Sequence, residues 1–201
     1  WLGECRIAQH EDGKIANIAP RNNQPSFFSG LLAGSVGWGD ACIIVPYTLY
    51  QRDGDVRILE ENYEMMKGWY HFLEERAKKL PVNPIKILKR NPYRRYTIET
   101  GIDYGEWCEP DVESTSAMRT PQGKVATAFF ARSGQMMAEI ANILEKTEDA
   151  AHYKKTSEMA KKAWRFIATE DGRIHSDRQA DYVRALAFFW RVMKQNRQQL
   201  T

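Results

Sequence analysis

Two short stretches of the sequence combine tryptophan, carboxylate and glycine. The first is GWGDA at residues 37–41, where Trp38 and Asp40 stand at the start of an apolar helical run. A sugar offers C–H faces that stack on an aromatic ring and hydroxyls that donate to a carboxylate, and glycines let a backbone approach a ligand closely. The local alternative is that Asp40 caps the helix and Trp38 packs beside it. The two interpretations are compatible, because a carboxylate at a helix start is held rigidly.

The second stretch is ETGIDYGEWCEP at residues 99–110, which has neither helix nor strand periodicity. Its acids and aromatic residues are Asp103, Tyr104, Glu106, Trp107 and Glu109. A simple connecting loop seldom concentrates so many costly groups. The pair Glu106–Trp107 again joins a carboxylate to a ring. We therefore take Trp38, Asp40, Glu106 and Trp107 as the candidate sugar-binding residues.

Other chemistries find little support in the sequence. DRQADYVRALAFF at residues 177–189 contains Gln179 and Tyr182, for which a helix cap and a core aromatic are the favoured roles. No nucleophile elbow, phosphate-binding loop or dinucleotide fingerprint occurs. The four histidines are scattered, and the three cysteines lack paired spacing, so we expect neither a metal nor another cofactor. The cysteine pattern mildly favours a reducing, cytoplasmic compartment, and nothing else bears on localisation.

The composition excludes two classes of partner. The net charge is only +3 over 201 residues, and no basic stripe alternates with aromatics, so nucleic acid is not expected. The apolar runs are far shorter than the roughly 20 residues needed to span a bilayer, so a membrane is not expected either.

The elements that must position the candidate residues are helices. Apolar residues recur with helical periodicity over 40–51, 55–79, 125–145, 149–168 and 178–198, and residues 1–10 resemble the end of another helix. Over 55–79 the apolar residues form one continuous face, made of Leu59, Tyr63, Met66, Tyr70, Leu73 and Ala77. Two long connections, 11–37 and 80–122, hold both candidate stretches. Connections of this length are usually functional or disordered, and their aromatic and acidic content favours ordered loops. We expect one all-α domain over residues 1–201.

The motifs, in their order and spacing, resemble the catalytic domain of family 78 glycoside hydrolases, the α-L-rhamnosidases. The resemblance rests on GWGDACIIVPYTLYQRDGD, ETGIDYGEWCEP, KVATAFFARSGQMMAEIANIL and DRQADYVRALAFF, and it extends to WLGECRIAQHEDGKIANIAP. It implies an (α/α)6 barrel, also called an alpha/alpha toroid or six-hairpin glycosidase fold. This chain would form about half of it, the central helices. Loops at one end of the barrel would form the sugar pocket.

The resemblance also implies an activity, the inverting hydrolysis of terminal α-L-rhamnose from an oligosaccharide or glycoside. Trp38 and Trp107 would line the rhamnose pocket, while Asp40 and Glu106 would contact hydroxyls or support the wall. The family often has Asp in place of Glu106, which puts direct contact by this longer side chain in doubt. Inversion needs two carboxyl groups roughly 6.5–9.5 Å apart. The family's general-acid and general-base motifs have no counterpart in this sequence, so catalytic residues remain unassigned and this chain alone is expected to be inactive.

Two alternatives remain open. One is another (α/α)6 carbohydrate enzyme, such as a glucoamylase-like hydrolase or an unsaturated uronyl hydrolase. The other is a non-catalytic helical binding or scaffold protein, whose two long loops would share no mouth. Half a barrel would also leave an apolar edge uncovered, so we expect self-association of the isolated chain.

Overall fold

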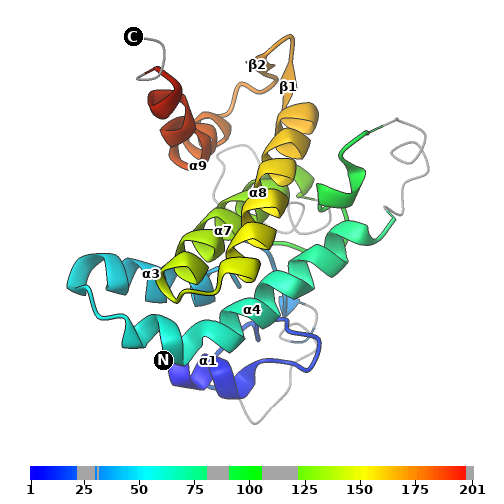
Figure 1. Cartoon of the computed structure of the whole chain (residues 1–201). Helices are drawn as coiled ribbons and strands as arrows, with labels where there is room; N and C mark the ends of the chain where they lie inside the picture. Colours follow the sequence, from blue (N-terminus) through cyan, green and yellow to red (C-terminus); the bar gives the residue numbers. More distant parts are fainter. Residues whose placement is uncertain (22–29, 31, 81–90, 106–121, 198–201) are drawn as a thin grey trace.

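The computed structural model describes all residues except 22–29, 31, 81–90, 106–121 and 198–201 (Figure 1). The described elements are α1 (Leu2–Ala8), α3 (Ala41–Asp53), α4 (Arg57–Lys78), the 3-10 helix η1 (Arg94–Tyr96), α7 (Gly123–Ile143), α8 (Thr147–Ala168), the two-residue strands β1 (Thr169–Glu170) and β2 (Arg173–Ile174), and α9 (Gln179–Arg197). The strands form one short antiparallel hairpin. The prediction of an all-α chain is confirmed, and the five long helices begin and end within about two residues of the predicted bounds.

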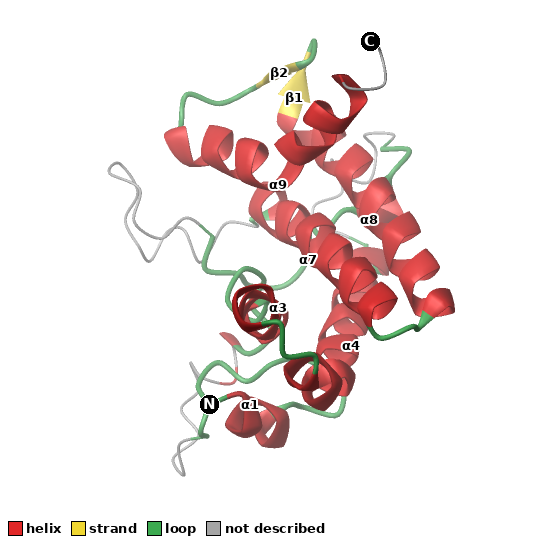
Figure 2. Ribbon diagram, turned by 60° about the vertical axis from the view of Figure 1, so that its left-hand side comes forward, coloured by secondary structure: helices red, strands yellow, loops and turns green. Residues whose placement is uncertain are grey.

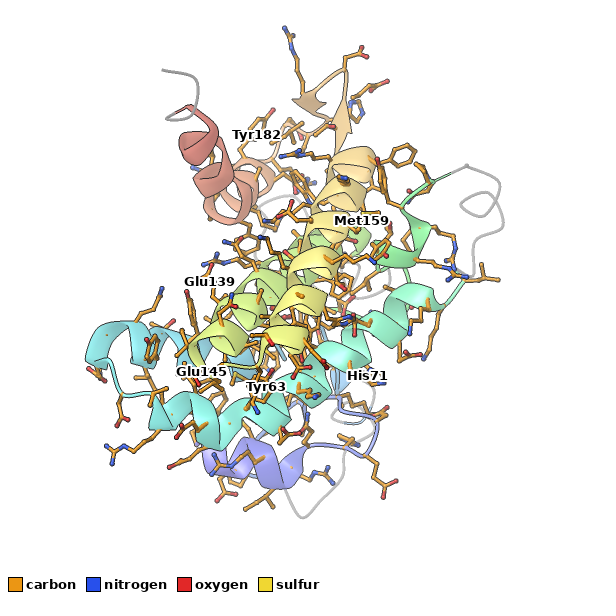
Figure 3. The ribbon with its side chains drawn as sticks, viewed as in Figure 1. Tyr63, His71, Glu139, Glu145, Met159 and Tyr182 are labelled. Atoms are coloured by element: carbon orange, nitrogen blue, oxygen red, sulfur yellow. The ribbon has the colours of Figure 1, made fainter. Side chains whose placement is uncertain are left out.

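The helices α7 and α8 form an antiparallel hairpin that lies side by side along most of its length (Figures 1 and 2). Its turn docks on α4. The ammonium of Lys146 lies 4.9 Å from the ring centroid of Tyr63, whose hydroxyl donates to Asp149 at 2.8 Å. Tyr63 on α4 and Glu145 in the turn are labelled in Figure 3. The turn therefore fixes the hairpin against the first half of α4.

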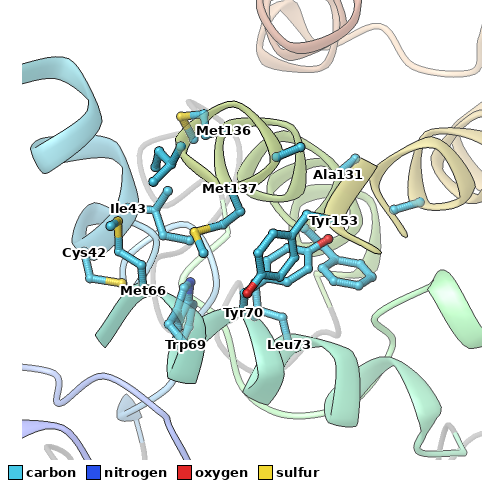
Figure 4. Close-up of a cluster of buried hydrophobic side chains, with 14 of the residues drawn as sticks. Cys42, Ile43, Met66, Trp69, Tyr70, Leu73, Ala131, Met136, Met137 and Tyr153 are labelled. Carbon is cyan, nitrogen blue, oxygen red and sulfur yellow. The ribbon is translucent and has the colours of Figure 1, made fainter. Parts of the chain in front are cut away.

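One face of α4 forms the centre of the core (Figure 4). The apolar stripe predicted from its periodicity is buried at every position, namely Leu59, Tyr63, Met66, Tyr70, Leu73 and Ala77. This is the outcome expected when apolar residues recur every three or four positions. The stripe packs against Met137 of α7, Tyr153 of α8 and Ile43 of α3. Three helices are thus held in fixed positions around α4.

The chain segments that precede α3 and α7 both reach the last turns of α4, where Gly34 and Thr100 contact Arg76. Near the end of α4, Arg76 donates to the carbonyl of Gly34 at 3.0 Å. Near the start of α7, the Thr127 hydroxyl accepts the Ile98 N–H at 3.1 Å. The chain before α3 and the chain before α7 therefore converge on the end of α4.

The described side chains of α9, up to Phe188, are covered unevenly. Phe188 packs edge-on against Phe129 of α7, with ring centroids 5.0 Å apart. In contrast, Tyr182, Val183 and Leu186 are between 44% and 55% exposed, so the core role favoured for Tyr182 is wrong (Tyr182 is labelled in Figure 3). Exposed apolar side chains of this kind are what an uncovered barrel edge would show. Within the described residues, no helix is long and apolar enough to cross a bilayer.

Candidate functional site

Two loops far apart in sequence meet at the converging end of the bundle. We call residues 34–40 the first site loop and residues 97–105 the second site loop. The Val36 N–H donates to Asp103 Oδ1 at 2.7 Å, and the Tyr104 N–H donates to Ser35 Oγ at 3.0 Å. The two long connections therefore meet, in the described residues, as far as Gly105, and we call this meeting place the mouth. That they open on one sugar pocket stays a prediction.

Trp38 stands at this mouth with 52% of its surface exposed. Its indole N–H donates to the carbonyl of Asn17 at 2.9 Å, and its ring tilts at 46° against Tyr104 with centroids 5.1 Å apart. The Tyr104 hydroxyl donates to Asn17 Oδ1 at 2.8 Å. One asparagine therefore holds both rings. A ring that is fixed yet half open can accept the apolar face of a ligand at a small cost in side-chain entropy.

The glycines on either side of Trp38 are explained by internal packing. Gly37 adopts a φ of 86°, a left-handed conformation that other residues seldom take. A Cβ atom at Gly39 would lie 2.5 Å from the indole of Trp69, so only glycine lets the turn rest on that ring. The sequence suggested that these glycines make room for a ligand. The structure instead assigns them to shaping the turn that presents Trp38.

Asp40 lies inside the protein, with none of its surface exposed. Its Oδ2 accepts the Gly37 N–H at 2.7 Å, and its Oδ1 accepts the indole N–H of Trp69 at 3.2 Å and the hydroxyl of Ser133. We expected Asp40 either to contact a sugar hydroxyl or to support the wall. Its burial corrects the first expectation, because a side chain with no exposed surface cannot reach a sugar. The carboxylate is enclosed because the first site loop curls over it and α4 and α7 close the far side.

The role of Asp40 at the start of α3 also differs from the expectation. It occupies the N-cap position, but its backbone is helical (φ −60°, ψ −15°) and its side chain caps no N–H of α3. The carboxylate turns back to Gly37 instead. Desolvation raises the pKa of Asp40, and the hydrogen bonds from Ser133, Gly37 and Trp69 oppose part of that rise. Asp40 therefore supports the turn beneath Trp38.

Glu106 and Trp107, the other two candidates, lie outside the described residues. The described chain stops just before them at Gly105, which follows Tyr104 at the mouth. A Cβ at Gly105 would lie 2.4 Å from the Gln122 side chain, beside the start of α7. The part that Glu106 and Trp107 play in the site stays a prediction.

Sequence reasoning missed three contributors to this mouth, namely Asn17, Ser35 and Arg76. Arg76 carried a signal, because it lies three residues after Leu73 and seven after Trp69, on the buried face of α4. A charged residue on an apolar stripe requires a buried partner. Asn17 and Ser35 carried no comparable signal. In the described part of the chain, no cluster of three or more histidine, cysteine or acidic residues could hold a metal.

The sequence is similar to curated α-L-rhamnosidases. An α-L-rhamnosidase from Formosa agariphila is 31% identical over 191 residues, which cover 94% of this chain and 18% of that protein. An α-L-rhamnosidase from Streptomyces avermitilis is 31% identical over 189 residues, which cover 93% of this chain and 15% of that protein. The chain thus spans less than a fifth of the length of these curated relatives.

Solved structures agree with the sequence comparisons. The Streptomyces avermitilis α-L-rhamnosidase complexed with L-rhamnose superposes with a TM-score of 0.70 at 30% identity, covering 94% of this chain and 15% of that one. The Aspergillus terreus enzyme superposes with a TM-score of 0.68 at 24% identity, covering 94% of this chain and 20% of that one, and supports the fold alone.

A family model for the bacterial alpha-L-rhamnosidase 6 hairpin glycosidase domain matches residues 1–199. This match covers nearly the whole chain, and it confirms the predicted fold, part of an (α/α)6 barrel. The chain belongs to the bacterial α-L-rhamnosidase six-hairpin glycosidase family.

Proposed function

We propose that this chain supplies a wall of the rhamnose pocket in an inverting α-L-rhamnosidase, which removes terminal α-L-rhamnose from an oligosaccharide or glycoside. Family membership supports the reaction class, and a similar structure was solved with L-rhamnose. The observation that carries the proposal is Trp38, half exposed and held by Asn17 and Tyr104 at the mouth where the site loops meet.

In this proposal Trp38 and Tyr104 bind the sugar through its apolar surface. Rhamnose is a deoxy sugar, so it presents a methyl group and ring C–H bonds that a half-open indole can cover. Binding pockets commonly combine such aromatic walls with a few polar groups that fix the orientation. Glu106 and Trp107 follow Tyr104 directly in the chain and are proposed to extend the same wall.

The acid–base chemistry is not assigned to the carboxylates at this mouth. Inversion requires one carboxyl group to protonate the leaving oxygen and another to activate a water. Asp40 is fully buried and already accepts three hydrogen bonds, and Asp103 is buried against Arg76. Neither group can exchange a proton with a glycosidic oxygen. We therefore propose that this chain contributes binding, and that residues 1–201 act as one unit of the barrel.

A titration of the purified chain with L-rhamnose tests the binding role. We expect the indole N–H resonance of Trp38 to shift, and Trp38→Ala to weaken binding about fivefold or more, since an aromatic contact contributes roughly 1 kcal/mol beyond its buried area. Trp1→Ala is the matched control, because Trp1 is also an exposed tryptophan (60%) but lies in the chain before α1. Equal affinities of wild type and Trp38→Ala would contradict the proposal.

The alternatives from the sequence provide the control sugars. A glucoamylase-like or uronyl hydrolase site would respond to D-glucose or a D-glucuronide, and a scaffold protein would respond to none. In the complete enzyme to which we assign the chain, Trp38→Ala should lower kcat/KM for an aryl α-L-rhamnoside by a similar factor. Cleavage of aryl glucosides without aryl rhamnosides would favour the first alternative.

A further inference from the structure

We propose that Arg76 and Asp103 are positioning residues, which lock the two site loops together and so set the orientation of Trp38 and Tyr104. The lock itself follows from the contacts of these two side chains. Its importance for sugar binding rests on the function proposed above.

The guanidinium of Arg76 makes a two-pronged contact with Asp103. Nη1 donates to Oδ1 and Nη2 to Oδ2, each at 3.0 Å. Nη1 also donates to the carbonyl of Gly34 at 3.0 Å, and Nη2 donates to the carbonyl of Thr100. The two side chains are only 5% and 3% exposed. One arginine at the end of α4 therefore binds backbone from both site loops and the carboxylate of the second.

Asp103 completes the connection from the other side. Its Oδ1 accepts the N–H of Val36 in addition to the Arg76 contact. Trp38 follows Val36 by two residues, and Tyr104 follows Asp103 directly. We call the paired rings of Trp38 and Tyr104 the platform. A shift of the Asp103 carboxylate would therefore move both rings.

A purely stabilising role explains these contacts less well. A buried ion pair often contributes no more stability than an apolar pair of similar size, because removing both charges from water is costly. An apolar pair here would leave unpaired the N–H of Val36 and the carbonyls of Gly34 and Thr100, all three in the site loops. The loops, more than the core, depend on the charges.

The second site loop is shaped to fit the guanidinium. Gly101 adopts a φ of 83°, and a Cβ there would lie 2.6 Å from Nη2 of Arg76. Only glycine allows the backbone this close approach. The ring of Phe72 lies on another side, 5.9 Å from the Arg76 Cζ.

Hydrogen exchange and indole resonances of the chain test the lock. In the wild type we expect the Val36 amide to exchange as slowly as helix-core amides, because its acceptor is a buried carboxylate. Asp103→Asn keeps an oxygen that can accept this N–H but removes the charge and one arm of the Arg76 contact, so it should speed that exchange by about tenfold, as expected when a hydrogen bond to a charged group becomes a neutral one. It should also shift the Trp38 indole resonance while leaving that of Trp69, which is bound to Asp40, in place. Arg76→Lys, which cannot make the two-pronged contact, should act in the same direction.

The matched control is Asp55→Asn, which removes a carboxylate from the exposed Arg57–Asp55 pair. It should leave the Val36 amide and both indole resonances unchanged. Fast exchange of Val36 in the wild type would overturn the proposal. So would an unmoved Trp38 resonance in folded Asp103→Asn or Arg76→Lys, or an equal shift of Trp38 and Trp69, which would indicate general loosening. If Asp103→Asn does not fold, Arg76→Lys and the wild-type exchange rate decide.

The two proposals fail separately. L-rhamnose that leaves the wild-type Trp38 resonance unmoved would count against the proposed function, while the exchange data would still decide the lock. A wild type that binds L-rhamnose, together with an Asp103→Asn variant that binds it equally with an unmoved Trp38, would overturn the lock alone.

Discussion

Replacing Asp40 with alanine should strongly destabilise the chain, because the carboxylate is the shared acceptor for three donors. The substitution leaves the indole N–H of Trp69 and the N–H of Gly37 without this acceptor, whereas the Ser133 hydroxyl can turn to a carbonyl of its own helix. Each buried donor left unpaired costs about 1–3 kcal/mol, so the two together cost roughly 2–6 kcal/mol. That is a large share of the 5–15 kcal/mol typical of a domain.

Urea denaturation followed by circular dichroism measures this loss. The midpoint should fall while the slope stays constant, since the surface exposed on unfolding hardly changes. Asp53→Ala is the control, because Asp53 is an exposed carboxylate that pairs with its neighbour Arg52 on the surface, and its removal should leave the curve in place. A loss below about 1 kcal/mol in Asp40→Ala would refute the argument, because even one unpaired buried donor costs more than that.

Three further outcomes are expected. Burial raises the pKa of Asp40, so the folded state keeps this proton to higher pH than the unfolded state. The stability of wild type relative to Asp40→Ala should therefore fall as the pH rises above 3.8, the ordinary pKa of the group. Paired urea curves measure this difference in stability, and a difference that grows with pH would contradict the argument. Gly134→Ala should lower the melting temperature, because its Cβ would lie 2.2 Å from the Tyr70 hydroxyl; an unchanged temperature would show that the helices separate freely. The isolated chain should self-associate through α9, and Leu186→Lys should reduce the mass seen by light scattering; a monomer at high concentration would count against this.

The helices could be predicted from the sequence because their signals are local. The stripe on α4 needs only its own spacing to be identified, and all six predicted positions are buried. The exposure of the Trp38 ring could also be predicted, since a tryptophan in a glycine turn before a helix has little chain around it to cover it.

The partners of the charged residues could not be predicted in the same way. Asp40 belongs to the pattern GWGDA that suggested a cap and a sugar contact, yet its role as an acceptor is decided by Trp69 and Ser133, which lie 29 and 93 residues away. Arg76 and Asp103 are 27 residues apart on different elements. No periodicity encodes such pairs, because they exist only once the helices have packed.

The contacts between the two site loops have a consequence for the order of events in folding. The hydrogen bonds of Trp38 and Tyr104 to Asn17 connect residues 21 and 87 positions apart, so neither can form while helices fold individually. A compact intermediate with native far-ultraviolet signal would still lack the tilted pair of Trp38 and Tyr104. If this pair binds a sugar as proposed above, recognition would emerge at the last step of folding, and sugar affinity would report on completed packing better than helix content does.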